Sequence, residues 1–325
     1  MSKKLTNNIL LLTVVLVVLA SILFVGLAAN NTFAYADEDD GNLEYQEVYV
    51  TYNNQFNVWG TTTVIDITEI NRPFASLDIR VLDGVQNLYF TDGGQNLGLV
   101  NSKIVIESRS TDINIYIDGF DIAGAENNCT FINKSTKGTV TFINNGTNPV
   151  VISGATRTGS GSFEDGLGIS GVIYTKGNIA FSGEAGFIID GAGYISSTTY
   201  GGNLDYGNTG LQVNGSKKVY VNTTVDIIGG NGQSGAYIPG LLGFDGGHGG
   251  YAFDGSSANI IISEAGFLSL TGGHGGNGAC QYGSGTLGAA GKGCAAYKGS
   301  IHVNDTSKFT YVAGEDGEAG RYYNK

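Results

Sequence analysis

The sequence predicts an all-β fold, a parallel β-helix (solenoid) with glycine-rich loop insertions along one edge. Short β-prone runs recur with a period of about 41 residues, aliphatic residues alternate within the runs, and 42 of the 53 glycines lie from Gly154 onward. Charged residues make up 14% and hydrophobic residues 41%, so a core can form but an ordinary helical enzyme is not expected. Glycine follows no three-residue period along the chain and only three prolines occur, which argues against collagen.

Residues 1–36 are predicted to be a signal peptide. Lys3 and Lys4 precede an apolar run at residues 9–29, in which 18 of 21 residues are apolar, and an A-x-A triplet with small residues at Ala34 and Ala36 follows. Positive, apolar and small residues in this order are typical of a secretory signal. Because the run is also long enough to span a bilayer, an uncleaved anchor is the alternative. We therefore expect a secreted or cell-surface protein, with membrane contact only through this segment.

Residues 37–97 are expected to form an N-terminal cap and the first coils, and residues 98–325 the β-helix proper. Short runs rich in β-branched and aromatic residues, separated by Asn, Gly and Ser turns, indicate strands throughout both parts. In the first part these runs lie at residues 47–52, 63–67, 77–82 and 87–90. In the second part, the runs before residue 171 lie at residues 103–108, 113–122, 129–132, 139–143 and 149–152.

From residue 171 the repeat reaches its full length. Its central runs begin at Ile179, Val219, Ile260 and Ile301, and each has one short run before it and one after it. Three strands of this length cannot bury a face alone, so neighbouring units must stack. We expect the four named residues to form one vertical aliphatic ladder. A propeller of about four blades is the alternative, but each blade would need four full strands.

The glycine-rich excursions between repeats are interpreted as structureless insertions of about 20 residues. A stacked core tolerates such loops, because closure entropy costs only about 0.6 kcal/mol per doubling of length. Their aromatic residues are the predicted binding residues, since tyrosine on small-residue loops suits contact with sugar or protein. The alternative for each ring is that it covers an apolar solenoid edge. The candidates are Tyr194, Tyr200, Tyr206, Tyr237, Phe244 and Tyr282.

The cysteines and histidines point to no cofactor and no metal. Cys280 and Cys294 form a possible disulfide, which leaves Cys129 unpaired, and the alternative is that Cys294 is a buried thiol. His248 and His274 each lie in GGHGG, with no Cys or carboxylate at the spacing that a zinc site requires. The excursions also lack the aspartate of the calcium-binding nonapeptide.

Three short strands per turn, Ile and Val ladders, Asn and Gly corners and insertions on one edge resemble the right-handed parallel β-helix of pectin-lyase-like and bacterial surface or adhesin-type proteins. The resemblance covers about residues 98–312, and the GG-x-GG excursions are most similar to the surface-protein branch. Similarity to polygalacturonases would imply catalytic aspartates and an R-x-K beside the GHG of His248 or His274. Those partners are absent, so no catalytic residue is predicted.

The sequence therefore predicts a non-enzymatic, exported protein that binds a surface glycan or an extracellular protein. A carbohydrate-active enzyme (polysaccharide lyase or hydrolase) with an unrecognised site and a structural envelope component are the alternatives. The net charge of −12, with 17 unclustered Lys and Arg residues, argues against nucleic acid as a partner. An exposed last coil would leave free strand edges, which predicts self-association through the C-terminal coil.

Overall fold

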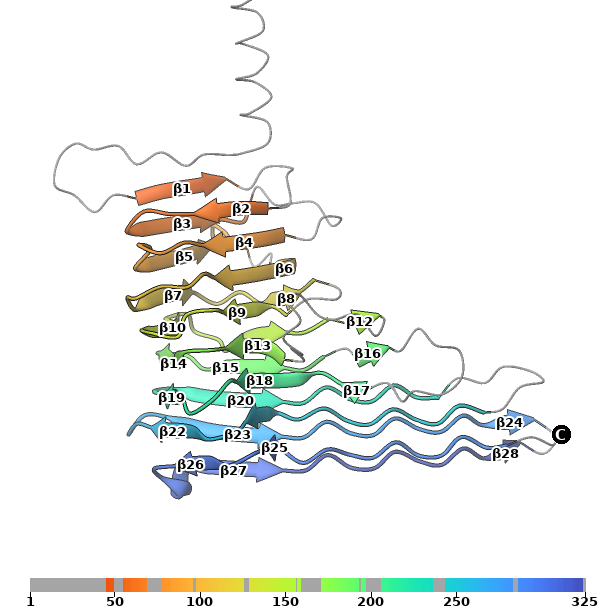
Figure 1. Cartoon of the computed structure of the whole chain (residues 1–325). Helices are drawn as coiled ribbons and strands as arrows, with labels where there is room; N and C mark the ends of the chain where they lie inside the picture. Colours follow the sequence, from red (N-terminus) through yellow and green to blue (C-terminus); the bar gives the residue numbers. More distant parts are fainter. Residues whose placement is uncertain are drawn as a thin grey trace, which may run out of the picture.

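The computed structural model describes residues 45–49, 55–68, 77–95, 98–125, 129–155, 157–158, 171–192, 194–196, 206–235, 243–282 and 286–323. These residues form an all-β structure that includes the 3₁₀ turn Thr306–Lys308 and no α-helix. Figure 1 shows the strands stacked along one axis, with extended segments projecting from one side. The predicted all-β class is confirmed, and the stacked parallel sheets are compatible with a parallel solenoid.

One large sheet contains nine parallel strands, and each pairs with the next strand of the sheet further along the chain. From residue 62 onward, alternate side chains of these strands point into the core, as the period of two predicted. The strands are β1 (Tyr45–Tyr49), β3 (Thr62–Asp66), β5 (Asn87–Thr91), β7 (Ile113–Ile117), β10 (Thr139–Asn144), β14 (Asn178–Gly183), β19 (Lys218–Val221), β22 (Ala258–Ile262) and β26 (Ile301–Val303). We call the chain from one of these strands to the next a level.

The second sheet divides at β6, because the first half of β6 pairs with β8 and its second half with β9. Levels before this point therefore contribute one strand to the second sheet, and later levels contribute two. The strands are β2 (Gln55–Val58), β4 (Leu77–Val81), β6 (Leu99–Ile106), β8 (Ile122–Gly124), β9 (Phe131–Asn133), β11 (Val150–Ser153), β13 (Gly171–Thr175), β15 (Phe187–Asp190), β18 (Thr209–Val213), β20 (Thr224–Ile228), β21 (Phe253–Gly255), β23 (Phe267–Thr271), β25 (Tyr297–Lys298) and β27 (Phe309–Val312).

The predicted aliphatic ladder lies in the first sheet. Ile179 pairs with Val219 and Val219 with Ile260, and all three side chains are buried. The prediction that Ile301 continues this column is wrong by two residues, because Val303 pairs with Ile260 and Ile301 with Ala258. A shift of two residues keeps the same side chains facing the core, so hydrophobic burial does not distinguish the two registers.

Levels become longer along the chain. Ile113 pairs with Val140, a step of 27 residues, whereas Ile260 pairs with Val303, a step of 43 residues. The additional residues project from one edge of the sheets (Figure 1). This edge carries two small sheets, formed by β12 (Arg157–Thr158), β16 (Tyr194–Ser196) and β17 (Tyr206–Gly207), and by β24 (Gln281–Tyr282) and β28 (Tyr322–Tyr323).

The interpretation of the excursions as structureless loops is wrong for the described residues. Five extended segments lie side by side and exchange backbone hydrogen bonds, at residues 229–235, 243–250, 272–280, 286–294 and 313–321. We call them the glycine bundle. These segments are ordered by regular backbone hydrogen bonds to one another. The side-chain patterns that reveal strands and helices in a sequence do not indicate this kind of pairing.

Candidate functional site: the glycine bundle and its tip

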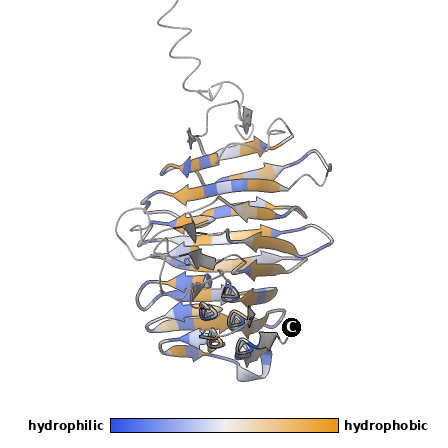
Figure 2. Cartoon of the chain, turned by 90° about the vertical axis from the view of Figure 1, so that its right-hand side faces the viewer, coloured by the Kyte–Doolittle hydropathy of each residue, from blue (hydrophilic) through white to orange (hydrophobic). Residues whose placement is uncertain are grey.

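Glycine recurs at every third residue within each segment of the bundle. In the central segment Gly272, Gly275 and Gly278 form one such series, and in the last segment Gly314, Gly317 and Gly320 form another. Figure 2 looks along the segments and shows them as small triangles, as expected for three residues per turn. This is the geometry of polyproline II, a left-handed helix that has no internal hydrogen bonds. Each segment must therefore satisfy its backbone groups through its neighbours.

Those neighbours are bonded in two directions. The segments at residues 229–235, 272–280 and 313–321 form one layer, in which the Gly232 N–H donates to the His274 carbonyl at 2.8 Å. The segments at residues 243–250 and 286–294 form a second layer, in which the chain runs in the opposite direction. The Gly276 N–H donates to the Gly247 carbonyl at 2.8 Å, which joins the two layers.

The spacing of the segments leaves no room for side chains between them. A Cβ added at Gly232 would lie 2.0 Å from the Gly247 carbonyl oxygen, and one at Gly276 would lie 2.0 Å from the Gln233 carbonyl oxygen. Only glycine fits such positions, as at the axis of the collagen triple helix. The segment at residues 272–280 bonds to all four other segments and has glycine at five of nine positions, whereas that at residues 313–321 bonds to two and has it at three of nine.

Outward side chains at several turns also bond the segments together, because each accepts the N–H of a residue on an adjacent segment. The acceptors are short polar side chains, and the resulting bonds tie the segments together across the bundle surface. They are Asn231 Oδ1 from His274, Ser234 Oγ from Asn277, Asp245 Oδ1 from Ala289, His248 Nδ1 from Lys292, His274 Nδ1 from Glu315, Asn277 Oδ1 from Glu318 and Asp316 Oδ1 from Gly293.

His248 and His274 thus serve as structural acceptors, with Nδ1 to N distances of 2.8 and 3.0 Å. In the described part of the chain, no group of three or more His, Cys, Asp or Glu side chains is placed to hold a metal ion. The surface of the bundle is acidic. Lys292 Nζ lies 2.9 Å from Asp316 Oδ2, and this hydrogen bond lowers the pKa of Asp316 below its ordinary value.

The far end of the bundle is closed by β24 and β28 (Figure 1). These strands are parallel, with Gln281 opposite Tyr322 and Tyr282 opposite Tyr323. Of these residues only Tyr282 was among the predicted binding residues. Tyr322 and Tyr323 were missed, although the letters RYY follow the last glycine of the bundle. We call these four paired positions the tip.

The other predicted binding residues do not join the tip. Tyr194 lies in β16 and Tyr206 in the antiparallel neighbour β17, where Ile195 faces Tyr206. Phe244 is half-buried within the bundle, and its carbonyl accepts the Ala279 N–H at 2.9 Å. Tyr200 and Tyr237 lie outside the described residues.

The possible disulfide between Cys280 and Cys294 is absent, and Cys129 does not form a disulfide either. The Cys294 N–H bonds to the Gly273 carbonyl, and Cys280 lies seven residues further along that segment. At about 3.1 Å per residue this is roughly 22 Å, far beyond disulfide reach. Burial raises the pKa of the half-buried Cys294 thiol, which also shares a hydrogen bond with the Tyr251 side chain.

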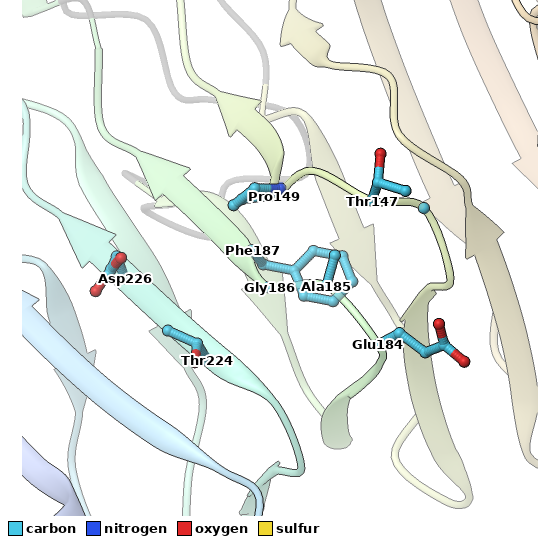
Figure 3. A pocket seen from close by; sticks show the side chains of 9 residues that line it. Thr147, Pro149, Glu184, Ala185, Gly186, Phe187, Thr224 and Asp226 are labelled. Carbon is cyan, nitrogen blue, oxygen red and sulfur yellow. The ribbon is translucent and has the colours of Figure 1, made fainter.

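A groove of about 540 Å³ lies away from the glycine bundle, where the beginnings of β15 and β20 meet the turn before β11 (Figure 3). Glu184 and Asp226 are its two carboxylates, and Figure 3 shows them at opposite sides of the lining. No Lys, Arg or His lines it. Two separated carboxylates without a basic partner do not define a recognisable catalytic pair.

Comparisons with known proteins return no match: no family model, no curated protein and no solved structure is similar to this chain. In the part of the chain that the structure describes, no helix has the length and apolar character needed to cross a membrane. The apolar run at residues 9–29 lies outside that part.

Proposed function

We propose that this protein is an exported, non-enzymatic, right-handed parallel β-helix of the adhesin type, which binds a surface glycan or an extracellular protein through the tip of its glycine bundle. The predicted signal peptide accounts for export, and an uncleaved N-terminal segment would be its contact with a membrane. The resemblance to surface proteins with this architecture remains part of the proposal.

The observation that carries the proposal is the position of the tip. The bundle is held by backbone hydrogen bonds along its whole length, so it projects its end away from the sheets without a hydrophobic core of its own. At that end the pairing of β24 with β28 brings Tyr282, Tyr322 and Tyr323 into one small region. Tyrosine is enriched in binding surfaces because it offers a large apolar face with a polar end and loses little conformational entropy.

The two alternatives, a carbohydrate-active enzyme and a structural envelope component, have less support. A polysaccharide hydrolase requires two carboxylates that flank one glycosidic bond, and Glu184 and Asp226 lie at opposite sides of the groove (Figure 3). A lyase requires a basic group to abstract a proton, and no Lys, Arg or His lines this groove. A purely structural component would not need aromatic residues paired at the end of an arm.

The test measures binding of the exported chain to arrays of surface polysaccharides and extracellular matrix proteins, with release of reducing sugar followed on the same polysaccharides. We expect binding without release. The double variant Tyr282→Ala, Tyr323→Ala should weaken binding at least tenfold, since tyrosine is enriched among the hot-spot residues whose truncation costs about 2 kcal/mol or more, and about 1.4 kcal/mol is a factor of ten.

Tyr220→Ala is the matched control, because Tyr220 is a half-buried tyrosine of β19, away from the bundle. It should bind as the unsubstituted chain does. Equal binding by the tip variant would contradict the assignment of the tip. Release of reducing sugar would favour the enzyme, and an absence of binding to every glycan and protein would favour the structural role.

A further inference from the structure

The last level of the sheets has an open face. Within the described residues no strand pairs with the outer edge of β25, β26 or β27, although the inner edges pair with β21, β22 and β23. This face forms the lower end of the molecule in Figure 1. Free strand edges bind further strands readily, because their N–H and C=O groups lack partners.

Core side chains are exposed at this face. Tyr311 occupies the column of Leu270, which is fully buried, yet Tyr311 is 59% exposed. Phe309 occupies the column of the buried Leu268 and is itself only half-buried. Val303 is likewise half-buried, although it continues the buried column of Ile260. At the last level, side chains that continue the columns of the hydrophobic core are therefore not covered by a further level of the described chain.

The aromatic residues of the face are packed against one another. The Tyr311 ring lies 5.5 Å from that of Tyr297, edge to face, and 5.6 Å from that of Phe309. Such mutual packing fixes the side chains before any partner arrives, which lowers the entropy cost of association. The neighbouring lysines are also engaged, because Lys308 Nζ donates to the Glu264 carbonyl at 2.7 Å and Lys298 lies 3.4 Å from Asp254.

The rest of the molecule indicates what fits this face. Every inner face with these columns is covered by another level of the same chain. The step from β1 to β3 takes only 17 residues, and the first levels have two strands, so they do not match a face of three strands. The last level matches itself in strand number and in cross-section.

We propose that two copies of this chain associate through their last levels, about a two-fold axis that places β26 antiparallel to β26 of the second copy. A two-fold contact is the commonest way in which a soluble chain covers one surface with the same surface of a second copy. Tyr311, Phe309 and Val303 form the centre of this interface. The inference is independent of ligand binding at the tip.

The test is light scattering of the full exported chain over a range of concentrations. We expect a dimer, and we expect Tyr311→Asp to weaken it at least a hundredfold, because a charge would be buried without a partner. The side chain of Tyr311 is largely exposed, so Tyr311→Asp should fold, and its unfolding temperature and circular dichroism check this. Val100→Asp is the control, since Val100 is 54% exposed on β6, and it should remain dimeric.

A second variant tests the strand pairing. His302→Cys places a thiol at the middle of β26, where antiparallel partners have Cβ atoms about 5 Å apart and a disulfide can form. Oxidation should give a covalent dimer that Tyr116→Cys, on β7, does not give. A monomeric unsubstituted chain, a dimer that Tyr311→Asp leaves intact, open-ended polymers, or a dimer without the cross-link would each overturn the proposal.

Discussion

The stacked sheets and the glycine bundle are two solutions to packing in one chain. In the sheets, side chains fill the interior: Phe142 is 1% exposed and lies 4.8 Å from Phe131 and 5.6 Å from Phe181, ring to ring. In the bundle, glycines face the neighbouring segments, and carbonyl oxygens occupy the places where their Cβ atoms would be. The first region depends on hydrophobic burial and the second on complete backbone hydrogen bonding.

This difference teaches that tolerance to substitution should be opposite in the two regions. An aliphatic core accepts other aliphatic residues of similar volume at modest cost. The bundle accepts no added atom at its glycines but leaves its outward residues unconstrained by packing. Four substitutions, in order of decreasing effect, measure this contrast.

Phe142→Ala should have the largest effect. Removal of a buried phenyl ring costs about 3–5 kcal/mol through lost burial and a cavity. Because the bundle is anchored to the sheets, we expect the whole molecule to unfold at a lower denaturant concentration. Chemical unfolding followed by circular dichroism measures this. Phe142→Leu is the control and should lose much less, and equal losses would show that the volume of this ring is not what stabilises the sheets.

Gly276→Ala should disrupt the bundle and leave the sheets intact. The new Cβ meets the Gln233 carbonyl at 2.0 Å, so at least two segments must separate, at a cost of about 3 kcal/mol. Hydrogen exchange should show loss of protection at residues 272–280 but not in β10 or β14. Ala289→Val, at an exposed outward position of the bundle, is the control and should change little. Retained protection in Gly276→Ala would contradict the requirement for glycine.

His274→Leu should weaken the bundle by about 1 kcal/mol, because the Glu315 N–H loses its acceptor. His274→Asn should retain most of the stability, since Asn231 and Asn277 already perform this role on the same surface. Exchange of the Glu315 amide distinguishes the two variants. Equal protection in both would mean that the acceptor contributes nothing.

Acidification should have the smallest effect on stability. It should destabilise the bundle and stabilise the region around β15. The lowered pKa of Asp316 means that its contribution is present above the ordinary aspartate pKa and is lost as the pH falls through the lowered value. Burial raises the pKa of Asp190 in β15, so its ionisation opposes folding and acid relieves that opposition. Exchange from about pH 5 to about pH 3 should show the bundle losing protection relative to β15, and Asp316→Asn should reduce the difference.

Much of the sheet structure could be predicted because period-two alternation follows directly from strand geometry. Ile179, Val219 and Ile260 lie in one buried column as expected. The register of Ile301 could not be predicted, because a shift of two residues leaves the same side chains facing the core and the same side chains facing outward. The strands of residues 45–91 also pair continuously with those that follow, without a break at residue 98.

The bundle could have been predicted in part. Its local glycine period is present in the letters, but along the whole chain it is masked by glycines of turns such as Gly84 and Gly119, which have φ of +104° and +82°. The side-chain acceptors could not be predicted, since His274 and Glu315 are brought together only when segments 41 residues apart lie side by side. The pairing that forms the tip has the same origin, as Tyr282 and Tyr323 are also 41 residues apart.

The glycine period of the bundle bears on how such a chain can change over generations. Outward positions already hold Asn, Ser, Asp, His and Lys without altering the path of the backbone. Replacement at those sites by another side chain that accepts the neighbouring N–H would therefore change the surface chemistry of the arm and keep its shape, whereas replacement at the intervening glycines would separate the segments. In this scaffold, shape and surface chemistry are thus encoded largely by separate residues.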